Sequence, residues 1–278
     1  EEEKSNIIKE KLLASYHDTK KVSILDLLDS KDEVIKEFGE YVYDKVFVHY
    51  TAKQWNIPIE QVDTSVINRV PVILGYDDRY FQDKYQFMPK NGYNEIFENM
   101  LSHKNIDIEL QKDAKDLLEI KNNKIYVDGL EYKGEVIYSG ALDELLSYQY
   151  GALPYRSLNL EFTDYKENYY QPSSVVNYPN DEKFTRITEF KYLSNQIVKD
   201  NTTILREYPL TYDYKNSKHI PYYAILNDEN KKLYEKYYSL VKDIKNFHLC
   251  GRLAEYKYYN MDAVIKRALE LYREIKGE

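Results

Sequence analysis

Apolar side chains recur at helical spacing near the start of the chain. A helix is predicted over residues 2–16, where apolar positions lie three to four residues apart. The run Ser30-Lys31-Asp32-Glu33 matches a capping box, so a short helix is predicted to start there and to end at Gly39. Another helix is predicted over residues 40–50. The two apolar stripes are Ile7, Ile8, Leu12 and Leu13, and then Val42, Val46 and Phe47.

Prolines divide the following segment into short elements. Pro58 is predicted to begin a turn of helix, and Thr64 to cap a second one that Pro71 ends. Residues 89–92, Pro-Lys-Asn-Gly, predict a turn, after which helix resumes over residues 93–101. The second short helix carries Val66, Ile67 and Arg69.

Alternating segments predict β-structure in two places. Residues 106–110 alternate as a strand, and residues 121–133 predict a hairpin with turns at Asn122-Asn123 and Asp128-Gly129. A larger antiparallel sheet is predicted from four later segments, followed by a helix over residues 227–242. The four segments are residues 158–162, 174–178, 185–190 and 203–209.

An order of strand, glycine and helix occurs twice. It is found at residues 136–150 and again at residues 247–276, and it is typical of parallel α/β units. The two regions are therefore predicted to share one α/β layer, and the fold class is predicted as α/β with α+β elements. Four segments follow from this pattern, namely helical residues 1–103, α/β residues 104–150, antiparallel residues 151–245 and α/β residues 246–278.

Composition excludes several classes of partner. The 278 residues are 43% hydrophobic, which is enough for a large buried core, and the formal net charge of −8 argues against nucleic acid. No apolar run of the roughly 18 residues that span a membrane occurs, and the acidic start is unlike a signal peptide. The lone Cys250 suits a reducing compartment, so a cytoplasmic protein is expected. The five histidines show no ligand spacing, so no metal is expected.

Arginine is scarce in this chain. Only eight of its 39 basic residues are arginine, so lysine supplies the general positive charge. An arginine in this chain is therefore more often than usual a residue whose planar guanidinium with five donors has a specific role, such as binding phosphate. Three of them, Arg206, Arg267 and Arg273, are interpreted as surface residues.

Three runs of residues carry a family resemblance. They are Tyr-Thr-Ala-Lys-Gln-Trp at 50–55, Asp-Asp-Arg-Tyr-Phe at 77–81, and Gly-Arg-Leu-Ala-Glu-Tyr-Lys-Tyr-Tyr-Asn-Met at 251–261. In this order they resemble the UDP-galactopyranose mutase family, flavoenzymes that interconvert the six- and five-membered ring forms of UDP-galactose. The resemblance extends from about residue 40 to residue 276.

The resemblance implies a set of substrate-binding residues. Tyr80 corresponds to the residue that stacks on uracil, and Thr51 and Trp55 to residues at the sugar end. Arg69, on a mobile loop in the family, and Arg186 correspond to the two arginines that hold the diphosphate. Two tyrosines that reach the same phosphates and an asparagine on the nucleotide side complete the set, at Tyr223, Tyr258 and Asn177.

The cofactor implied by the resemblance is FAD, in its reduced form for activity. Its N5 atom is the family's nucleophile toward the anomeric carbon, so no side chain need serve as one. Arg252 is implied at the flavin pyrophosphate and Met261 near the flavin ring, with Arg156 on the flavin side. Asn260 stands where the family usually has aspartate, so one negative charge near flavin and substrate is absent.

The family's dinucleotide-binding N-terminus is the other departure. No G-x-G-x-x-G sequence occurs, so this chain is expected to lack that segment and to bind flavin weakly by itself. The resemblance also implies a homodimer formed through the helical region. Two alternatives remain open, namely a fragment that binds sugar nucleotides without turnover and an amine-oxidase-type flavin oxidoreductase.

Overall fold

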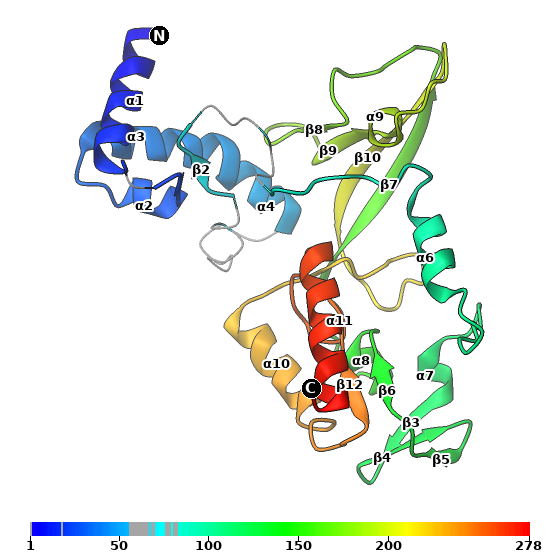
Figure 1. Cartoon of the computed structure of the whole chain (residues 1–278). Coiled ribbons are helices and arrows are strands. Elements are labelled where there is room, and N and C mark those ends of the chain that lie inside the picture. Colours follow the sequence, from blue (N-terminus) through cyan, green and yellow to red (C-terminus); the bar gives the residue numbers. More distant parts are fainter. Residues whose placement is uncertain (1, 18, 56–66, 68–69, 76–78, 80–82) are drawn as a thin grey trace. The chain divides into compact units, whose positions relative to one another are not determined.

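The computed structural model describes the whole chain except residues 1, 18, 56–66, 68–69, 76–78 and 80–82 (Figure 1). The chain divides into two units, each of which is described by itself. The first unit comprises residues 1–100 and 159–209, and the second comprises residues 101–158 and 210–278. The four predicted segments have other boundaries than these two units, and they stay a prediction.

The first unit begins with helices that follow one another closely. Helix α1 is Glu2–Ser15, as predicted, and α2 is a short helix that the sequence analysis missed. A nearly continuous helical run then covers Glu33 to Trp55. The remaining elements of this region are α2 (Ile24–Leu28), α3 (Glu33–Val42), the π-helix η1 (Tyr43–Val48), α4 (His49–Trp55), α6 (Tyr93–Leu101) and the antiparallel strands β1 (Lys21–Val22) and β2 (Val72–Ile73).

The predicted helix end at Gly39 is wrong. The helix continues through Gly39, and α2 packs closely against it there. A Cβ at position 39 would lie 2.9 Å from the Leu27 Cβ. Glycine at this position therefore reflects close packing instead of a helix stop. The N-cap also differs from the expected one, because Asp32 accepts the amides of Val34 and Ile35.

Two further predictions can be compared with this region. The turn at 89–92 is confirmed by the hydrogen bond from the Gly92 amide to the Pro89 carbonyl, and α6 follows it. The strand predicted at 106–110 is wrong, since these residues form no ladder and their apolar side chains are exposed. Alternation alone cannot make a strand without a partner to hydrogen-bond. The elements predicted from Pro58 to Pro71 lie outside the described residues, except that Ile67 is helical and buried and Val70 and Pro71 are described.

The predicted antiparallel sheet is confirmed, with one additional strand. Its order is β11-β7-β10-β9-β8, and the β8–β9, β9–β10 and β7–β11 pairs are antiparallel. Short helix α9 (Phe190–Ser194) follows β9. The strands are β7 (Tyr155–Tyr165), β8 (Val175–Asn177), β9 (Arg186–Glu189), β10 (Thr202–Thr211) and β11 (Tyr223–Ala224).

Arg206 on β10 is not the surface residue that was expected. Its side chain is 15% exposed, and its Nη2 donates to the Tyr165 and Tyr170 hydroxyls at 2.9 and 3.2 Å. Its guanidinium also faces the Phe184 ring. Aromatic faces and hydroxyls together accommodate a planar cation, so Arg206 is part of the packing of this sheet.

The second unit contains the predicted α/β elements. Strands β6 (Val136–Tyr138) and β12 (Phe247–Leu249) pair in parallel, which confirms that these distant regions share one layer. The predicted hairpin is also confirmed, with left-handed residues at both turns. The other elements are α7 (Ala114–Leu117), β3 (Leu118–Lys121), β4 (Lys124–Val127), β5 (Leu130–Tyr132), α8 (Leu142–Leu145), α10 (Asp228–Tyr238) and α11 (Met261–Lys276). Parallel and antiparallel sheets with helices agree with the predicted fold class.

Tyrosines make up much of the core of the second unit. Tyr237 donates to the Gly151 carbonyl at 2.6 Å and accepts the Tyr150 amide at 3.0 Å. Tyr256 donates to the carbonyls of Pro154 and Ile225 at 2.6 and 3.1 Å. These rings are buried while their hydroxyls bond to backbone, which is the usual condition for burying tyrosine.

Asp143, in the first turn of α8, is a buried carboxyl in this core. It is 1% exposed, its Oδ2 accepts the Leu153 amide at 2.8 Å, and its Oδ1 has no hydrogen-bond partner among the described residues. Burial raises the pKa of Asp143 to about 6, and backbone hydrogen bonds oppose the shift. The folded state therefore favours the protonated carboxyl.

We expect Asp143→Asn to stabilise the protein above neutral pH. A folded pKa above the unfolded value of 3.8 gives stability that is present below about pH 4 and is lost as pH rises through about 6. Asparagine keeps an acceptor for Leu153 and carries no charge, so the difference should reach roughly 2–3 kcal/mol at pH 7.5 and shrink at pH 4.5. Urea unfolding at both pH values measures it. The exposed Asp116→Asn is the control, and an equal difference at the two pH values contradicts the expectation.

Candidate functional site

Two residues predicted to bind substrate face each other across a β-hairpin of the first unit. Asn177 on β8 is the register partner of Arg186 on β9, and Arg186 is in turn the partner of Glu207 on β10. Directly opposed residues of antiparallel strands lie on the same face of a sheet. Asn177, Arg186 and Glu207 therefore form a row across three strands, which we call the Arg186 row.

An ion pair joins Arg186 to Glu207 within this row. Its Nε lies 2.7 Å from Glu207 Oε1, and the side chain of Arg186 is 33% exposed while that of Glu207 is 10% exposed. The carboxylate compensates the positive charge of the guanidinium beside the strand pairing. Glu207 was not singled out from the sequence, although its position beside Arg206 on a predicted strand was visible.

Lys53 on α4 is a second residue that the sequence analysis did not single out. Its Nζ donates to the Tyr178 carbonyl at 2.7 Å and to the Phe184 carbonyl at 3.3 Å. The Tyr178 carbonyl directly follows the last residue of β8, and the Phe184 carbonyl lies two residues before the first residue of β9. Burial lowers the pKa of Lys53, and the nearby Glu182 and Asp181 oppose that shift. The Tyr-Thr-Ala-Lys-Gln-Trp run is thus bonded to the hairpin that carries Asn177 and Arg186.

Four predicted substrate residues receive little or no description. Arg69 and Tyr80 lie outside the described residues. Thr51 and Trp55 lie on α4, of which only the backbone is described at these positions. Their roles stay predictions from the resemblance.

An arginine and two tyrosines cluster in the second unit. The Arg252 guanidinium lies 5.4 Å from the ring centre of Tyr223 and 4.9 Å from that of Tyr258. The two rings are stacked with centres 5.8 Å apart. We call these residues the Arg252 cluster. Residues predicted on the substrate side and on the cofactor side are thus neighbours here.

Hydrogen bonds hold Arg252 and its loop in place. Arg252 donates through Nη1 to the Tyr222 carbonyl at 3.2 Å and through Nη2 to the Tyr259 carbonyl. Buried Glu255 accepts the Gly251 amide and Arg267 Nε, each at 3.1 Å. Arg267 is therefore a half-buried partner of Glu255 and not the surface residue that was expected, whereas Arg273 is exposed as expected.

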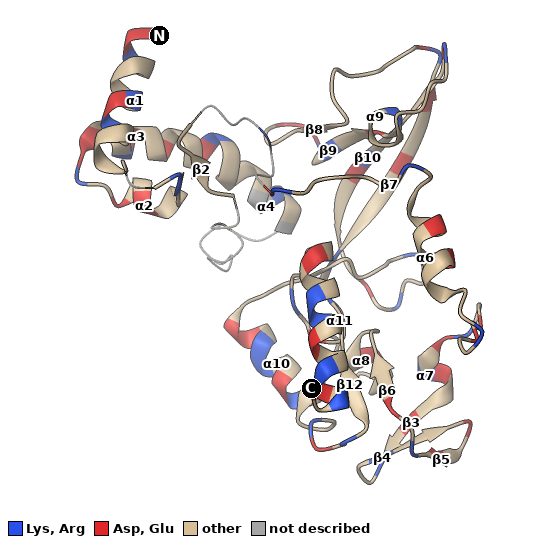
Figure 2. Ribbon diagram, in the orientation of Figure 1, with Lys and Arg blue, Asp and Glu red and all other residues tan. Residues whose placement is uncertain are grey.

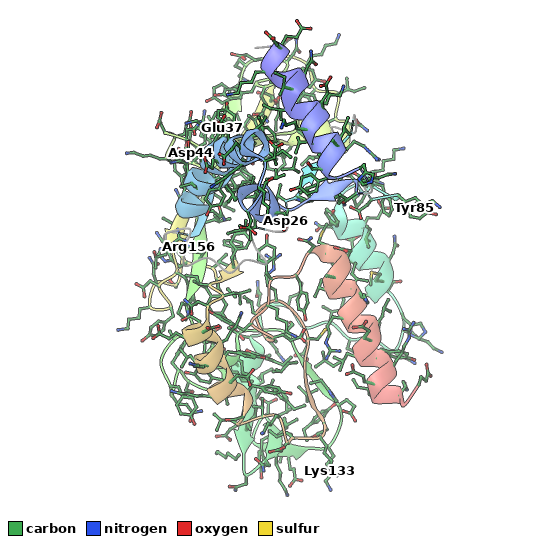
Figure 3. The ribbon with its side chains drawn as sticks, turned by 90° about the vertical axis from the view of Figure 1, so that its left-hand side faces the viewer. Asp26, Glu37, Asp44, Tyr85, Lys133 and Arg156 are labelled. Atoms are coloured by element: carbon green, nitrogen blue, oxygen red, sulfur yellow. The ribbon has the colours of Figure 1, made fainter. Side chains whose placement is uncertain are left out.

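Arg156, labelled in Figure 3, lies near the start of β7 and is almost fully buried. It is the register partner of Tyr223, and its Nη1 donates to Thr211 Oγ1 at 2.9 Å. Burial lowers its pKa. Arg156 therefore lies beside the strand that carries one member of the Arg252 cluster.

The start of α11 has the features of an anion-binding site. Asn260 is the N-cap but its side chain makes no capping hydrogen bond, and Met261 is 63% exposed. This helix of 16 residues follows a parallel strand, and the first amides of such a helix attract negative charge. Figure 2 shows charges of both signs along α11. Asp262 in the first turn adds a negative charge here, whereas Arg252, whose Nη2 donates to the Tyr259 carbonyl just before the helix, adds a positive one. Arg252 is therefore the residue here that would hold an anionic dinucleotide such as a flavin.

Other kinds of site receive no support from the described part of the chain. Within the described ranges, no group of three or more acidic, histidine or cysteine side chains is arranged to hold a metal ion. Cys250 is buried, and burial raises the pKa of its thiol. Among the helices described, none is long and apolar enough to cross a membrane.

Three relatives match this chain over most of its length. The dTDP-fucopyranose mutase of Escherichia coli is 34% identical over 264 residues, which cover 94% of this chain and 66% of that protein. UDP-galactopyranose mutases of Mycoplasma genitalium and Mycoplasma pneumoniae are 33% and 32% identical, and the match covers 90% of this chain and 62% and 63% of theirs. The chain thus spans just under two thirds of the length of these relatives.

A solved structure and a family model complete the comparison. A crystal structure from Exiguobacterium sp. 255-15, described as a protoporphyrinogen oxidase, matches 99% of this chain and 72% of its own with a TM-score of 0.55. At 11% identity that likeness concerns the fold alone. The family model of UDP-galactopyranose mutase matches residues 45–258, which include Asn177, Arg186 and the Arg252 cluster. The chain belongs to the UDP-galactopyranose mutase family.

Proposed function

We propose that this chain is the substrate-binding part of an isomerase that interconverts UDP-galactopyranose and UDP-galactofuranose. The Arg186 row is the observation that carries the proposal. A guanidinium that pairs with a carboxylate on one side and shares a sheet face with an amide side chain suits the recognition of a diphosphate. Family membership supports the reaction class, and the charges of the row support binding of the charged part of the substrate there.

The protein's own side chains are proposed to neutralise the charge of the diphosphate and to position the substrate. A diphosphate leaving group gains negative charge as its bond to the sugar breaks, so a pre-oriented cation stabilises the departing group. Asn177, Tyr223 and Tyr258 are proposed to contact the nucleotide and its phosphates. Thr51, Trp55, Arg69 and Tyr80 keep the roles that the family resemblance implies.

The cofactor is proposed to be FAD, of which this chain holds one side. Reduced flavin, when bound, supplies the nucleophile for the sugar. Arg252 and the first amides of α11 are proposed to meet its negative groups, with Met261 near the ring and Arg156 supporting β7 beside Tyr223. Asn260 gives the start of α11 a neutral cap where the family usually carries a negative one.

A second substrate is favoured by one relative. The Escherichia coli protein is named for dTDP-fucopyranose and matches this chain as well as the UDP-galactopyranose mutases do. Its named substrate differs in base and in hexose but keeps the nucleoside diphosphate. The diphosphate contacts at Arg186 suit both substrates, so they do not select between them.

Turnover with chemically reduced flavin tests the function. The expected result is ring contraction of UDP-galactopyranose, inhibited by UDP and absent with free galactose. Parallel assays with dTDP-fucopyranose and with UDP-N-acetylgalactosamine rank the sugars. UDP-sensitive binding of the sugar nucleotide without turnover supports a binding module instead, and oxidation of an amine that UDP does not inhibit supports the oxidoreductase.

The oligomeric state and the cellular location are also proposed from the family resemblance. The protein is proposed to act as a homodimer in the cytoplasm. Light scattering of the purified protein tests the oligomeric state.

A further inference from the structure

Lys53 joins two parts of the proposed substrate site. We propose that Lys53 is a positioning residue that locks α4 onto the β8–β9 hairpin, so that the α4 residues and the Arg186 row hold one nucleotide sugar together. This inference rests on the proposed function. Lys53 acts through carbonyl groups and needs no contact with the substrate.

The two acceptors of Lys53 belong to opposite sides of the hairpin. The Tyr178 carbonyl follows β8 and the Phe184 carbonyl precedes β9, and the ammonium donates to both. The chain stays paired here, because the Tyr178 amide donates to the Thr185 carbonyl at 2.9 Å. The Tyr178 and Phe184 rings also meet edge to face, with centres 4.8 Å apart. One cation thus bridges both strands at the end of the hairpin.

The bridge lies next to the residues that matter for binding. Tyr178 directly follows Asn177, and Phe184 is two residues from Arg186. A displacement of either carbonyl therefore moves the backbone that sets the Arg186 row. Because the register pairs Asn177 with Arg186, a shift of the hairpin moves both side chains together.

The position of Lys53 along α4 suits this role. Thr51 and Trp55 are four residues apart in a helix, so their backbone positions lie on one face. Position 53 is two residues from each and lies on the opposite side. The helix is therefore anchored to the hairpin from the side away from the two positions that the resemblance assigns to the sugar.

Lysine is well suited to such a bridge. An ammonium carries three donors on a flexible stem, and hydrogen bonds from a charged donor to carbonyls are stronger than neutral ones. The acidic side chains of Glu182 and Asp181 lie in the loop between β8 and β9 and favour the charged form. Methionine has a similar length but supplies neither the donors nor the charge.

A double-mutant cycle on UDP binding tests the proposal. In the flavin-loaded enzyme, Lys53→Met is expected to weaken UDP about 10-fold and to raise the KM for the sugar nucleotide more than it lowers kcat. If Lys53 acts by positioning the Arg186 row, the same change in an Arg186→Ala background should weaken residual binding less than about 3-fold. Lys53→Arg is expected to recover most of the affinity, because it restores a cationic donor. The matched control is Lys45→Met, which removes a cation from the preceding π-helix.

Each outcome decides the matter. Equal effects in the two backgrounds, or unchanged binding in Lys53→Met, overturn the positioning role. If Lys53→Met does not fold, Lys53→Gln carries the same cycle with a neutral donor, and additivity overturns the proposal there too. Absence of UDP binding and of turnover in the wild-type enzyme defeats the proposed function instead, so the two failures are distinguishable.

Discussion

Replacement of Arg186 by alanine is expected to lower kcat/KM for the sugar nucleotide by at least 100-fold and to weaken UDP binding by a similar factor. Charge-assisted hydrogen bonds from an arginine contribute roughly 1.5–3 kcal/mol each, and a diphosphate takes two of them. The variant also leaves Glu207 without its cation, although this carboxylate is mostly buried. An uncompensated carboxylate would then repel the diphosphate, so the loss exceeds that of the contacts alone.

The partner residue supplies the control for this prediction. The double variant Arg186→Ala, Glu207→Gln should recover folding stability, because no buried charge is left unpaired. It should recover only the part of the UDP affinity that repulsion by Glu207 removes, and not the part that the contacts of Arg186 supply. Titration calorimetry with UDP and urea unfolding measure the two quantities separately. Arg273→Ala, which removes an exposed arginine from α11, should change neither. Full recovery of UDP binding in the double variant would show that Arg186 only neutralises Glu207 and would remove it from the site.

Replacement of Arg252 by alanine is expected to weaken two ligands at once. Its guanidinium lies against the rings of Tyr223 and Tyr258 and donates to the carbonyls of Tyr222 and Tyr259. Its loss removes a cation proposed to meet the flavin and also releases tyrosines proposed to meet the substrate. Flavin affinity should fall roughly 10- to 100-fold, as expected for one or two charge-assisted hydrogen bonds, and the KM for the sugar nucleotide should rise in the same variant.

Two neighbouring changes separate charge from shape in the Arg252 cluster. Arg252→Lys keeps the positive charge but loses the planar fork, so it should recover only part of either affinity. Lys257→Ala removes an exposed cation from the same loop and serves as the control. Fluorescence titration of flavin and steady-state kinetics give the two readouts. If Arg252→Ala changes the affinity for one ligand alone, the cluster does not couple the two sides of the site.

The sequence predicts those parts of this fold that local turn residues or a recurring order of elements indicate. The Asn122-Asn123 and Asp128-Gly129 turns set their own hairpins, since these residues adopt the left-handed conformation that such turns require. The parallel pairing of β6 with β12 was predictable from the shared order of strand, glycine and helix. The prediction at Gly39 was wrong because the glycine there makes room for Leu27 on another helix. A single sequence does not show that neighbour.

The candidate site divides in the same way. Arg186, Arg252, Tyr223 and Tyr258 were identified through the family resemblance. Glu207 and Lys53 were missed because their roles depend on which strand or carbonyl lies opposite, at sequence distances of 21 for Arg186 to Glu207 and of 125 for Lys53 to Tyr178. Arg206 was misjudged for the same reason, because its aromatic neighbours come from three other segments.

The tyrosine core of the second unit has a consequence for how this protein can vary. A leucine can be replaced by another apolar residue of similar volume with modest loss, because dispersion has no direction. Tyr237 and Tyr256 differ, since each hydroxyl is matched to particular backbone groups at Gly151, Pro154 and Ile225. Phenylalanine at either position keeps the shape but removes the hydroxyl that donates to these carbonyls. Sequence drift in this core is thus constrained by hydrogen-bond partners as well as by volume, and related proteins should exchange such tyrosines together with the loops they bind.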